Sequence, residues 1–365
     1  MNTLKSACQA VAQRLERLDF AALWPGFRPY GFAFYGRSDA CMDGVCFPRP
    51  ENFRGCTALL FRGRPIAIWD VERGGLEDMD ILAAKLVHEM FHAFQLEQEE
   101  TRFPDDLEAL DYQPDEEALA WKWRENQLLA QAACSEDQAG TRALLSQLMA
   151  IRGRREARMG RAVQCEYMVE TAEGMAEYVE LLALAALSPE KYVRQLSAIR
   201  RELEDPSPFL LESRRLAYHT GSLLLLAAQT AGLPFHHQIG DEARPVFRIV
   251  AQTLPAADLG TTPIDPVLAS LPARQREERE RILTAFWARS PRYTEGDFTI
   301  IGYDPMNMWK LDGRIYGNHF WQLRDRHTEQ TITLTGETVL LVRDGREIAG
   351  YWRGRGEAEN GQEDL

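Results

Sequence analysis

The stretch Lys85-Leu86-Val87-His88-Glu89-Met90-Phe91-His92-Ala93-Phe94 contains the motif H-E-x-x-H. Positions four apart lie on the same face of a helix, so the imidazoles of His88 and His92 can bind one metal ion. Glu89, beside the first histidine, can then reach a water molecule held on that metal. The motif makes these three residues the candidates for a metal-dependent hydrolytic site.

The residues around this motif favour a helix. Residues 78–98 contain neither proline nor glycine and are rich in residues of high helix propensity. Four apolar residues fall on an arc that can be buried behind the histidines: Val87, Met90, Phe91 and Phe94. The alternative is an amphipathic helix with two ordinary histidines, in a helical protein without metal.

Composition excludes several classes of partner. The chain has 365 residues, of which 45% are apolar and 27% charged, as in ordinary globular proteins. Its net charge of −13 argues against a nucleic-acid partner and against an anionic membrane surface. Residues 1–18 lack the apolar core of a signal peptide, and no stretch approaches the roughly 20 apolar residues of a membrane span. We therefore expect a cytoplasmic protein.

The six cysteines form no C-x-x-C pair, which argues against a structural zinc knuckle. Cys41, Cys46 and Cys56 lie close together in the sequence, so a disulfide or a soft metal site among them is an alternative. In a reducing cytoplasm the expectation is that all six are free thiols.

A small sheet is predicted before the motif helix. Residues 1–20 favour a surface helix, and three segments have strand-like patterns: residues 30–35, 56–61 and 65–71. Arg62-Gly63-Arg64 has the composition of a hairpin turn between the last two. Gly74-Gly75 then separates this sheet from the motif helix.

From residue 114 to about residue 290 the pattern is almost wholly helical. The predicted helices are residues 114–134, 135–159, 162–187, 189–203, 206–231 and 265–289. Pro272 is expected to interrupt the last of them. The second ends in four arginines, which we expect to lie in solvent, where they suit the helix dipole: Arg152, Arg154, Arg155 and Arg158.

After Pro291 the pattern changes to short strands. The predicted strands are residues 298–303, 314–323, 331–334, 338–342 and 347–352. Asp312-Gly313 and Asp344-Gly345 are hairpin-turn dipeptides. The sequence therefore predicts a small antiparallel β domain over residues 291–353, followed by a disordered polar tail over residues 354–365.

Two histidines do not complete a catalytic zinc site, which usually has three protein ligands and a water. A later segment, E-T-A-E-G-M-A-E-Y, offers Glu173 as the third. Gly174 costs a helix interior about 1 kcal/mol relative to alanine, and a close approach to the other helix, which carries the histidines, is one physical reason for it. Glu177, one turn further, can accept the second ring N–H of a ligand histidine. Glu170 and Glu177 are alternative ligands if the helix register differs.

The glutamates of this segment also permit a simpler interpretation. Five of them share one helix face, as on many exposed helices: Glu166, Glu170, Glu173, Glu177 and Glu180. In that alternative the stripe is a solvated surface. The presence of both H-E-x-x-H and E-G-x-A in one chain favours the ligand role for Glu173.

Together the two motifs resemble those of the gluzincin metallopeptidases. The likeness is to the aminopeptidase-like and peptidase MA-like branches, in which the glutamate of an E-G-x-A segment is the third zinc ligand. The resemblance implies Zn²⁺ bound by His88, His92 and Glu173, with Glu89 as general base. It covers about residues 55–230, through two short motifs. Glu173 follows His92 by 81 positions (173 − 92), more than in the aminopeptidases, so two extra helices are expected between them.

A third element is Tyr218-His219-Thr220-Gly221. In the peptidases that the chain resembles, a tyrosine in a Y-x-x-G setting after the glutamate helix donates a hydrogen bond to the developing oxyanion. The resemblance gives this role to Tyr218, and an imidazole such as that of His219 can also fill it. The alternative is a tyrosine that only packs between helices.

The combined prediction is an α+β, predominantly α-helical protein. Residues 1–290 form a zincin-like metallopeptidase domain with a helical insert at about residues 101–160. The predicted function is hydrolysis of a peptide or protein substrate by a zinc-activated water, with an extended substrate paired to the strand at residues 65–71. The alternative is a non-catalytic zincin-like binding or regulatory module that uses the β domain as its contact surface.

Overall fold

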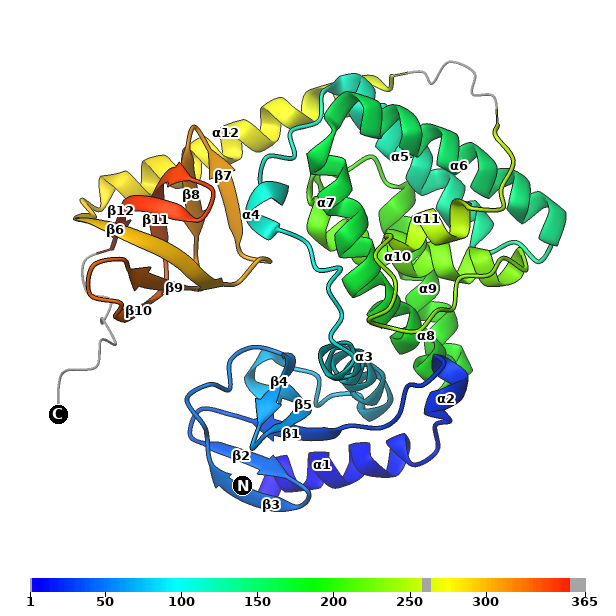
Figure 1. The fold of residues 1–365 in the computed structure, drawn as a ribbon, viewed down its shortest axis with the longest axis horizontal. Helices are drawn as coiled ribbons and strands as arrows, with labels where there is room; N and C mark the ends of the chain where they lie inside the picture. Colours follow the sequence, from blue (N-terminus) through cyan, green and yellow to red (C-terminus); the bar gives the residue numbers. More distant parts are fainter. Residues whose placement is uncertain (1, 258–263, 355–365) are drawn as a thin grey trace.

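The computed structural model describes residues 2–257 and 264–354, and its fold is α+β, with two separate sheets beside a body of helices (Figure 1). The first part of the chain contains α1 (Asn2–Leu15), α2 (Phe20–Leu23), β1 (Gly31–Tyr35), β2 (Asp39–Met42), β3 (Val45–Pro48), β4 (Thr57–Phe61), β5 (Arg64–Asp70), a 3-10 turn (Val71–Arg73) and α3 (Met79–Glu97). The predicted strands and the motif helix are thereby confirmed. The β2–β3 hairpin was not predicted, because its strands are only four residues long.

The first sheet has the strand order β3-β2-β1-β5-β4, with β1 and β5 parallel and the other pairs antiparallel. Successive residues of a strand face opposite sides. Ala67 and Trp69 therefore pack into the main core with α3, whereas Ile66 and Ile68 face a smaller core on the other side. The strand that was expected to pair with a substrate, β5, lies inside the sheet, and the two edge strands are β3 and β4.

Cys41 and Cys46 form a disulfide, which contradicts the expectation that all six cysteines are free thiols. The two residues lie opposite each other in the β2–β3 hairpin, with their Cα atoms 4.1 Å apart. Hairpin pairing brings the thiols together, and the sequence spacing alone did not reveal that pairing. Cys56 remains a free thiol.

The helical body follows α3. It consists of α4 (Asp106–Ala109), α5 (Glu116–Ala132), α6 (Gln138–Met159), α7 (Arg161–Val169), a π turn (Glu170–Gly174), α8 (Met175–Leu187), α9 (Pro189–Glu204), a 3-10 turn (Pro208–Leu211), α10 (Ser213–Thr230), α11 (Val246–Ala251) and α12 (Pro266–Ala288). The two helices expected between the motifs are α5 and α6. The single helix predicted at residues 162–187 is instead α7 and α8 joined by the π turn. Within the described ranges, no helix has both the length and the apolar character needed to cross a bilayer.

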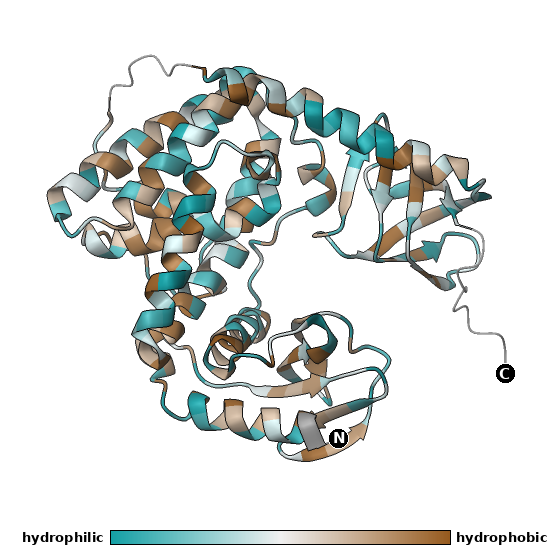
Figure 2. Ribbon diagram, turned by 180° about the vertical axis from the view of Figure 1, so that it is seen from behind, coloured by the Kyte–Doolittle hydropathy of each residue, from teal (hydrophilic) through white to brown (hydrophobic). Residues whose placement is uncertain are grey.

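Helix α12 connects the helical body to the second sheet. Its first turns place Leu268 and Leu271 in the main core, whereas Leu283 and Phe286 pack on the second sheet. Figure 2 shows hydrophilic residues gathered in the middle of this helix, between its two apolar ends. Pro272 does not interrupt α12, contrary to expectation. Leu268 and Leu271, which both precede Pro272, are buried, and they hold the first turns in place.

The second sheet is antiparallel and has the strand order β10-β9-β6-β12-β11-β8-β7. Its strands are β6 (Arg292–Tyr303), β7 (Met308–Leu311), β8 (Arg314–Gly317), β9 (Phe320–Asp325), β10 (Thr331–Thr335), β11 (Thr338–Asp344) and β12 (Glu347–Arg353). The strand predicted at residues 314–323 is two strands, β8 and β9, that separate at Asn318. The tail that was expected to be disordered lies outside the described residues beyond Gly354.

The segment that leaves α3 anchors this second sheet. Leu107 of α4 is buried in the core of the sheet together with Phe298 and Leu323. Lys310 of β7 also contacts Asp111, with Nζ 2.7 Å from the carboxylate. Leu107 and Asp111 thus attach the second sheet to the segment that follows α3.

Two of the four arginines at the basic end of α6 are buried, which contradicts their expected solvation, whereas Arg158 is exposed as expected. Arg152 and Arg155 are fully buried. Arg152 contacts Glu170 at 2.6 Å, and Arg155 contacts Glu125 at 2.6 Å and Glu166 at 2.5 Å. Burial by itself raises the pKa of Glu166, but Arg155 and Lys122 outweigh burial and lower it. The glutamates needed to pair these arginines come from α5, α7 and the π turn.

Replacing Arg155 with methionine leaves buried carboxylates without a counter-charge. We expect the free energy of unfolding to fall by about 3–5 kcal/mol, measured by urea denaturation. Arg158→Met is the matched control on the same helix, because Arg158 is exposed and its ion pair with Asp115 is solvated. The control variant should unfold close to the wild-type midpoint, and a similar loss in both variants would contradict the role of the buried network.

Candidate metal centre

The site begins with the position and rotation of α3. The carboxylate of Asp78 caps this helix by accepting hydrogen bonds from the N–H groups of Asp80 and Ile81, at 3.0 and 3.2 Å. The expected apolar arc is buried: Val87, Met90, Phe91 and Phe94. Burial of this arc turns the two motif histidines toward α8.

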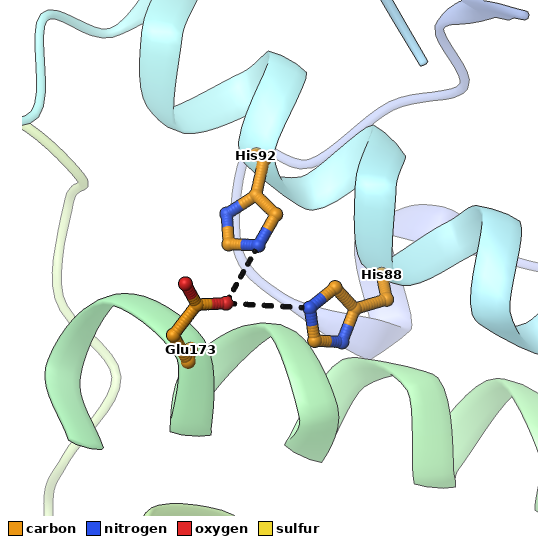
Figure 3. Close-up of side chains that lie close together, drawn as sticks. All are labelled: His88, His92 and Glu173. Carbon is orange, nitrogen blue, oxygen red and sulfur yellow. Dashed lines mark hydrogen bonds and ion pairs between the residues drawn. The ribbon is translucent and has the colours of Figure 1, made fainter. Parts of the chain in front are cut away.

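His88, His92 and Glu173 come together as predicted, although they lie on two different helical segments (Figure 3). Nε2 of His92 lies 3.0 Å from Oε2 of Glu173, and Nε2 of His88 lies 3.6 Å from the same oxygen. One ligand atom from each residue falls within 4.8 Å of the other two. Two imidazole nitrogens and one carboxylate oxygen are a donor set that suits zinc.

Gln95 orients the ring of His92. Oε1 of Gln95 lies 2.7 Å from Nδ1 of His92, and the amide nitrogen of Gln95 donates to the carbonyl of Ala172 at 3.1 Å. With Nδ1–H donating to Gln95, Nε2 keeps its lone pair toward Glu173, which is the tautomer that a metal ligand needs. Gln95 is fully buried, and the sequence interpretation missed it. Its place one helical turn after His92 was the available signal.

Glu173 lies in the π turn between α7 and α8, and such turns are frequent at functional sites. Oε1 of Glu173 accepts from Arg214 at 2.8 Å, which leaves Oε2 to face the histidines. Burial opposes the charged form of Glu173, but the histidines and Arg214 outweigh it and hold its pKa well below the ordinary value. The sequence interpretation missed Arg214, which lies one turn before Tyr218 on α10.

Gly174 permits a close helix contact as expected, but the partner is α10 and not the helix that carries the histidines. A Cβ atom added to Gly174 would lie 2.6 Å from the Cα of Gly221. A Cβ atom added to Gly221 would lie 2.7 Å from the carbonyl oxygen of Glu170. Because the two backbones touch, α10 is held at a distance that brings Arg214 and Tyr218 beside Glu173.

Glu177 does not contact His88, contrary to expectation. Its carboxylate instead lies 2.9 Å from Nδ1 of His219 and accepts from Ser222 at 2.8 Å. Glu180 takes the expected place, with Oε2 3.2 Å from Nδ1 of His88, although the two atoms are poorly aligned for a hydrogen bond. Nε2 of His219 also lies 3.2 Å from Oε2 of Glu202, so both ring nitrogens face carboxylates and neither is free to donate to an oxyanion.

The solvated-stripe alternative is contradicted, because the glutamates of α7, the π turn and α8 are enclosed. Glu166, Glu170, Glu173 and Glu177 are all buried. Glu170 faces away from the histidines and pairs with Arg152, and it also accepts from Thr220 at 2.6 Å. The carboxylates of Glu170 and Glu177 are therefore both paired with other side chains, and neither replaces Glu173 as a ligand.

Glu89 and Tyr218 lie beside the three candidate ligands. Glu89 is 9% exposed, and burial raises the pKa of its carboxyl group above the ordinary value. The ring of Tyr218 stacks on His88, with centroids 5.8 Å apart and planes 9° from parallel. Burial raises the pKa of Tyr218 well above its ordinary value, and the negative charge of Glu173 adds to this effect. Tyr218 therefore keeps its proton and can donate a hydrogen bond.

A second group of carboxylates also lies close together: Glu125, Glu166 and Glu170. These three are buried, and Lys122, Arg152 and Arg155 contact them directly. The three cations already balance the negative charge. We therefore assign no metal to this group.

Comparison of the chain with protein-family models, with curated proteins and with solved structures gives no match. The function of the chain is therefore inferred from the geometry and chemistry of the site.

Replacing Gly221 with alanine tests the helix contact that positions the site. The added methyl group would meet the backbone of Glu170, so we expect a loss of about 1–3 kcal/mol in the free energy of unfolding, measured by urea denaturation. Gly153→Ala is the control, because Gly153 is an exposed residue of α6 with open space around it. That variant should gain about 0.5–1 kcal/mol from reduced backbone entropy. If both variants changed the free energy of unfolding by the same amount, the close contact at Gly221 would be contradicted.

Proposed function

We propose that the chain is a zinc-dependent peptidase in which His88, His92 and Glu173 bind the metal. The observation that carries this proposal is the convergence of two imidazole nitrogens on a single carboxylate oxygen, at 3.0 and 3.6 Å. The hydrogen bond from His92 to Gln95 supports it, because metal-bound histidines commonly donate their second N–H in this way. The donor set leaves room for a water or a substrate atom as the fourth ligand.

The roles of the other residues follow from their positions. Bound zinc would lower the pKa of a coordinated water and polarise a substrate carbonyl. The carboxylate of Glu89 would accept a proton from the attacking water and pass it to the leaving amine. The neutral phenol of Tyr218 would donate a hydrogen bond to the developing oxyanion. Arg214 holds one oxygen of Glu173 and so directs the other oxygen toward the metal.

The open edge of β4 supports a peptide as the substrate. An extended peptide can pair with an exposed sheet edge through main-chain hydrogen bonds. β4 packs against α3, the helix that carries Glu89. Its residue Leu60 is exposed.

The location and the excluded partners stay predictions from the sequence. The net charge of −13 still argues against nucleic acid and anionic membranes as partners. The disulfide between Cys41 and Cys46 argues against the cytoplasmic location that we expected, because disulfides persist mainly in oxidising compartments.

Glu89→Gln separates catalysis from metal binding. We expect peptide hydrolysis to fall by about 10²–10⁴-fold, because the general base is lost, while zinc stays at about one ion per chain. A peptide-library cleavage assay and elemental analysis measure the two quantities. Glu97→Gln is the control on the same helix, because Glu97 contacts Arg28 and Tyr30 instead of the site. If wild-type protein loaded with zinc gives no chelator-sensitive cleavage, the non-catalytic alternative stands.

Gln95→Leu tests the orientation of His92. Loss of the Nδ1 acceptor should weaken zinc binding by about 10–100-fold, measured by competition with a chromophoric chelator. Circular dichroism of the metal-free variant checks its fold. Unchanged zinc affinity in a folded variant would show that Gln95 does not orient a metal ligand.

A further inference from the structure

A large cleft lies between the two sheets. Its volume is about 1160 Å³, and residues of both the first sheet's loops and the second sheet line it. Figure 1 shows the two sheets beside the helical body, with α3 between the first sheet and α8. Pockets for small molecules usually measure about 300–1,000 Å³. This cleft is larger, so it can take a segment of an extended chain.

The wall formed by the first sheet's loops is basic, although the chain as a whole has a net charge of −13. Two acidic residues, Glu51 and Asp70, line the same cleft. Four arginines line it: Arg37, Arg49, Arg54 and Arg73. A cleft with one dominant sign of charge concentrates ligands of the opposite sign.

Two of these arginines are held in place without a carboxylate partner among the described residues. Arg49 is half-buried and donates to the carbonyl of Phe53 at 2.6 Å, and its guanidinium lies over the ring of Tyr35, 4.7 Å from the centroid. Arg54 donates to the carbonyl of Glu51 at 3.3 Å. By contrast, Arg37 pairs with Glu72 at 3.0 Å. No carboxylate of the described residues therefore neutralises the positive charges of Arg49 and Arg54, and both remain available to a ligand.

The opposite wall carries neutral hydrogen-bonding groups. Thr331, Thr333 and Thr335 alternate along β10, so they share one face of this edge strand, and all three line the cleft. His319 also lines it, with Nδ1 2.6 Å from Asp304 and Nε2 3.0 Å from Arg73. The second wall thus offers hydroxyl groups to a polar chain and adds no acidic residue.

One end of the cleft leads into β4. Gly55 lines the cleft, and Cys56 follows it directly. β4 begins at the next residue and packs against α3, the helix that carries Glu89. A chain that lies in the cleft can therefore continue along the strand that contacts the motif helix.

We propose that this cleft binds an acidic peptide segment of the substrate, with its carboxylates at Arg49 and Arg54 and its polar groups at the threonines of β10. This inference rests on the proposed function in taking a peptide as the substrate. Arginine is suited to this role because its planar guanidinium pairs with a carboxylate through two hydrogen bonds. Residues outside the reacting bond would then supply much of the binding energy.

The test measures binding without turnover. Fluorescence anisotropy of zinc-loaded Glu89→Gln protein compares a labelled Glu-rich peptide with a Gln-rich peptide of equal length. We expect the Glu-rich peptide to bind about tenfold more tightly at low salt, and the difference to shrink as salt is raised. Equal binding of the two peptides would overturn the proposal, as would tighter binding of a single-stranded oligonucleotide.

Variants then locate the binding site. In the same background, Arg54→Gln and Arg49→Gln should each weaken binding of the Glu-rich peptide by about three- to tenfold. Arg17→Gln is the control, because Arg17 is an exposed residue of the segment after α1 and changes the net charge equally. An equal effect of all three would assign the preference to net charge and overturn the proposal. If Arg49→Gln unfolds, Arg54→Gln still tests the site. The side chain of Arg54 makes a single backbone contact, so we expect its replacement to leave the fold intact.

The outcomes for the two proposals are distinguishable. If the wild-type protein cleaves no peptide while the Glu-rich peptide still binds through Arg49 and Arg54, the peptidase proposal fails and the cleft assignment stands. If the protein cleaves peptides without regard to their charge, the peptidase proposal stands and the cleft assignment fails.

Discussion

The backbone contact between Gly174 and Gly221 is the constraint on which the candidate site depends. It brings α10 against the π turn, so that an added methyl group at either glycine would lie within 2.8 Å of backbone atoms. Arg214 and Tyr218 come from α10, whereas Glu173 comes from the π turn. Their mutual positions therefore follow from one contact between two glycines. The histidines are fixed separately, by burial of the apolar face of α3, and Gln95 links them to the π turn through the carbonyl of Ala172.

The other side of the same π turn is held by charge. Glu170 contacts Arg152 at 2.6 Å in a fully buried network, while Glu173 faces the histidines. A buried ion pair contributes little net stability compared with apolar packing, but an unpaired charge in the same place is strongly unfavourable. Such a network therefore penalises other packings of α6 against the turn. We interpret it as the support that keeps Glu173 in one position.

The two sheets differ in how far the sequence predicted them. Strand β5 and the turns at Gly63, Gly313 and Gly345 were recognised, because alternation and turn residues are local signals. The edge position of β4 was not, because strand order depends on pairing between distant segments. The cleft between the sheets was not foreseen either. It depends on α12 and on Leu107, which anchor the second sheet to the helical body and to the segment that follows α3.

The sequence by itself determined the helix of the H-E-x-x-H motif, the small residue at position 174 and the candidate donors His88, His92 and Glu173. These follow from periodicity and spacing along one element, and from the resemblance of two short motifs. The tertiary structure decided which glutamate faces the histidines, why Glu177 pairs with His219, and that Arg152 and Arg155 are buried. Those outcomes depend on the rotation of one helix against another, which is set by side-chain packing and charge pairing between segments far apart in the chain.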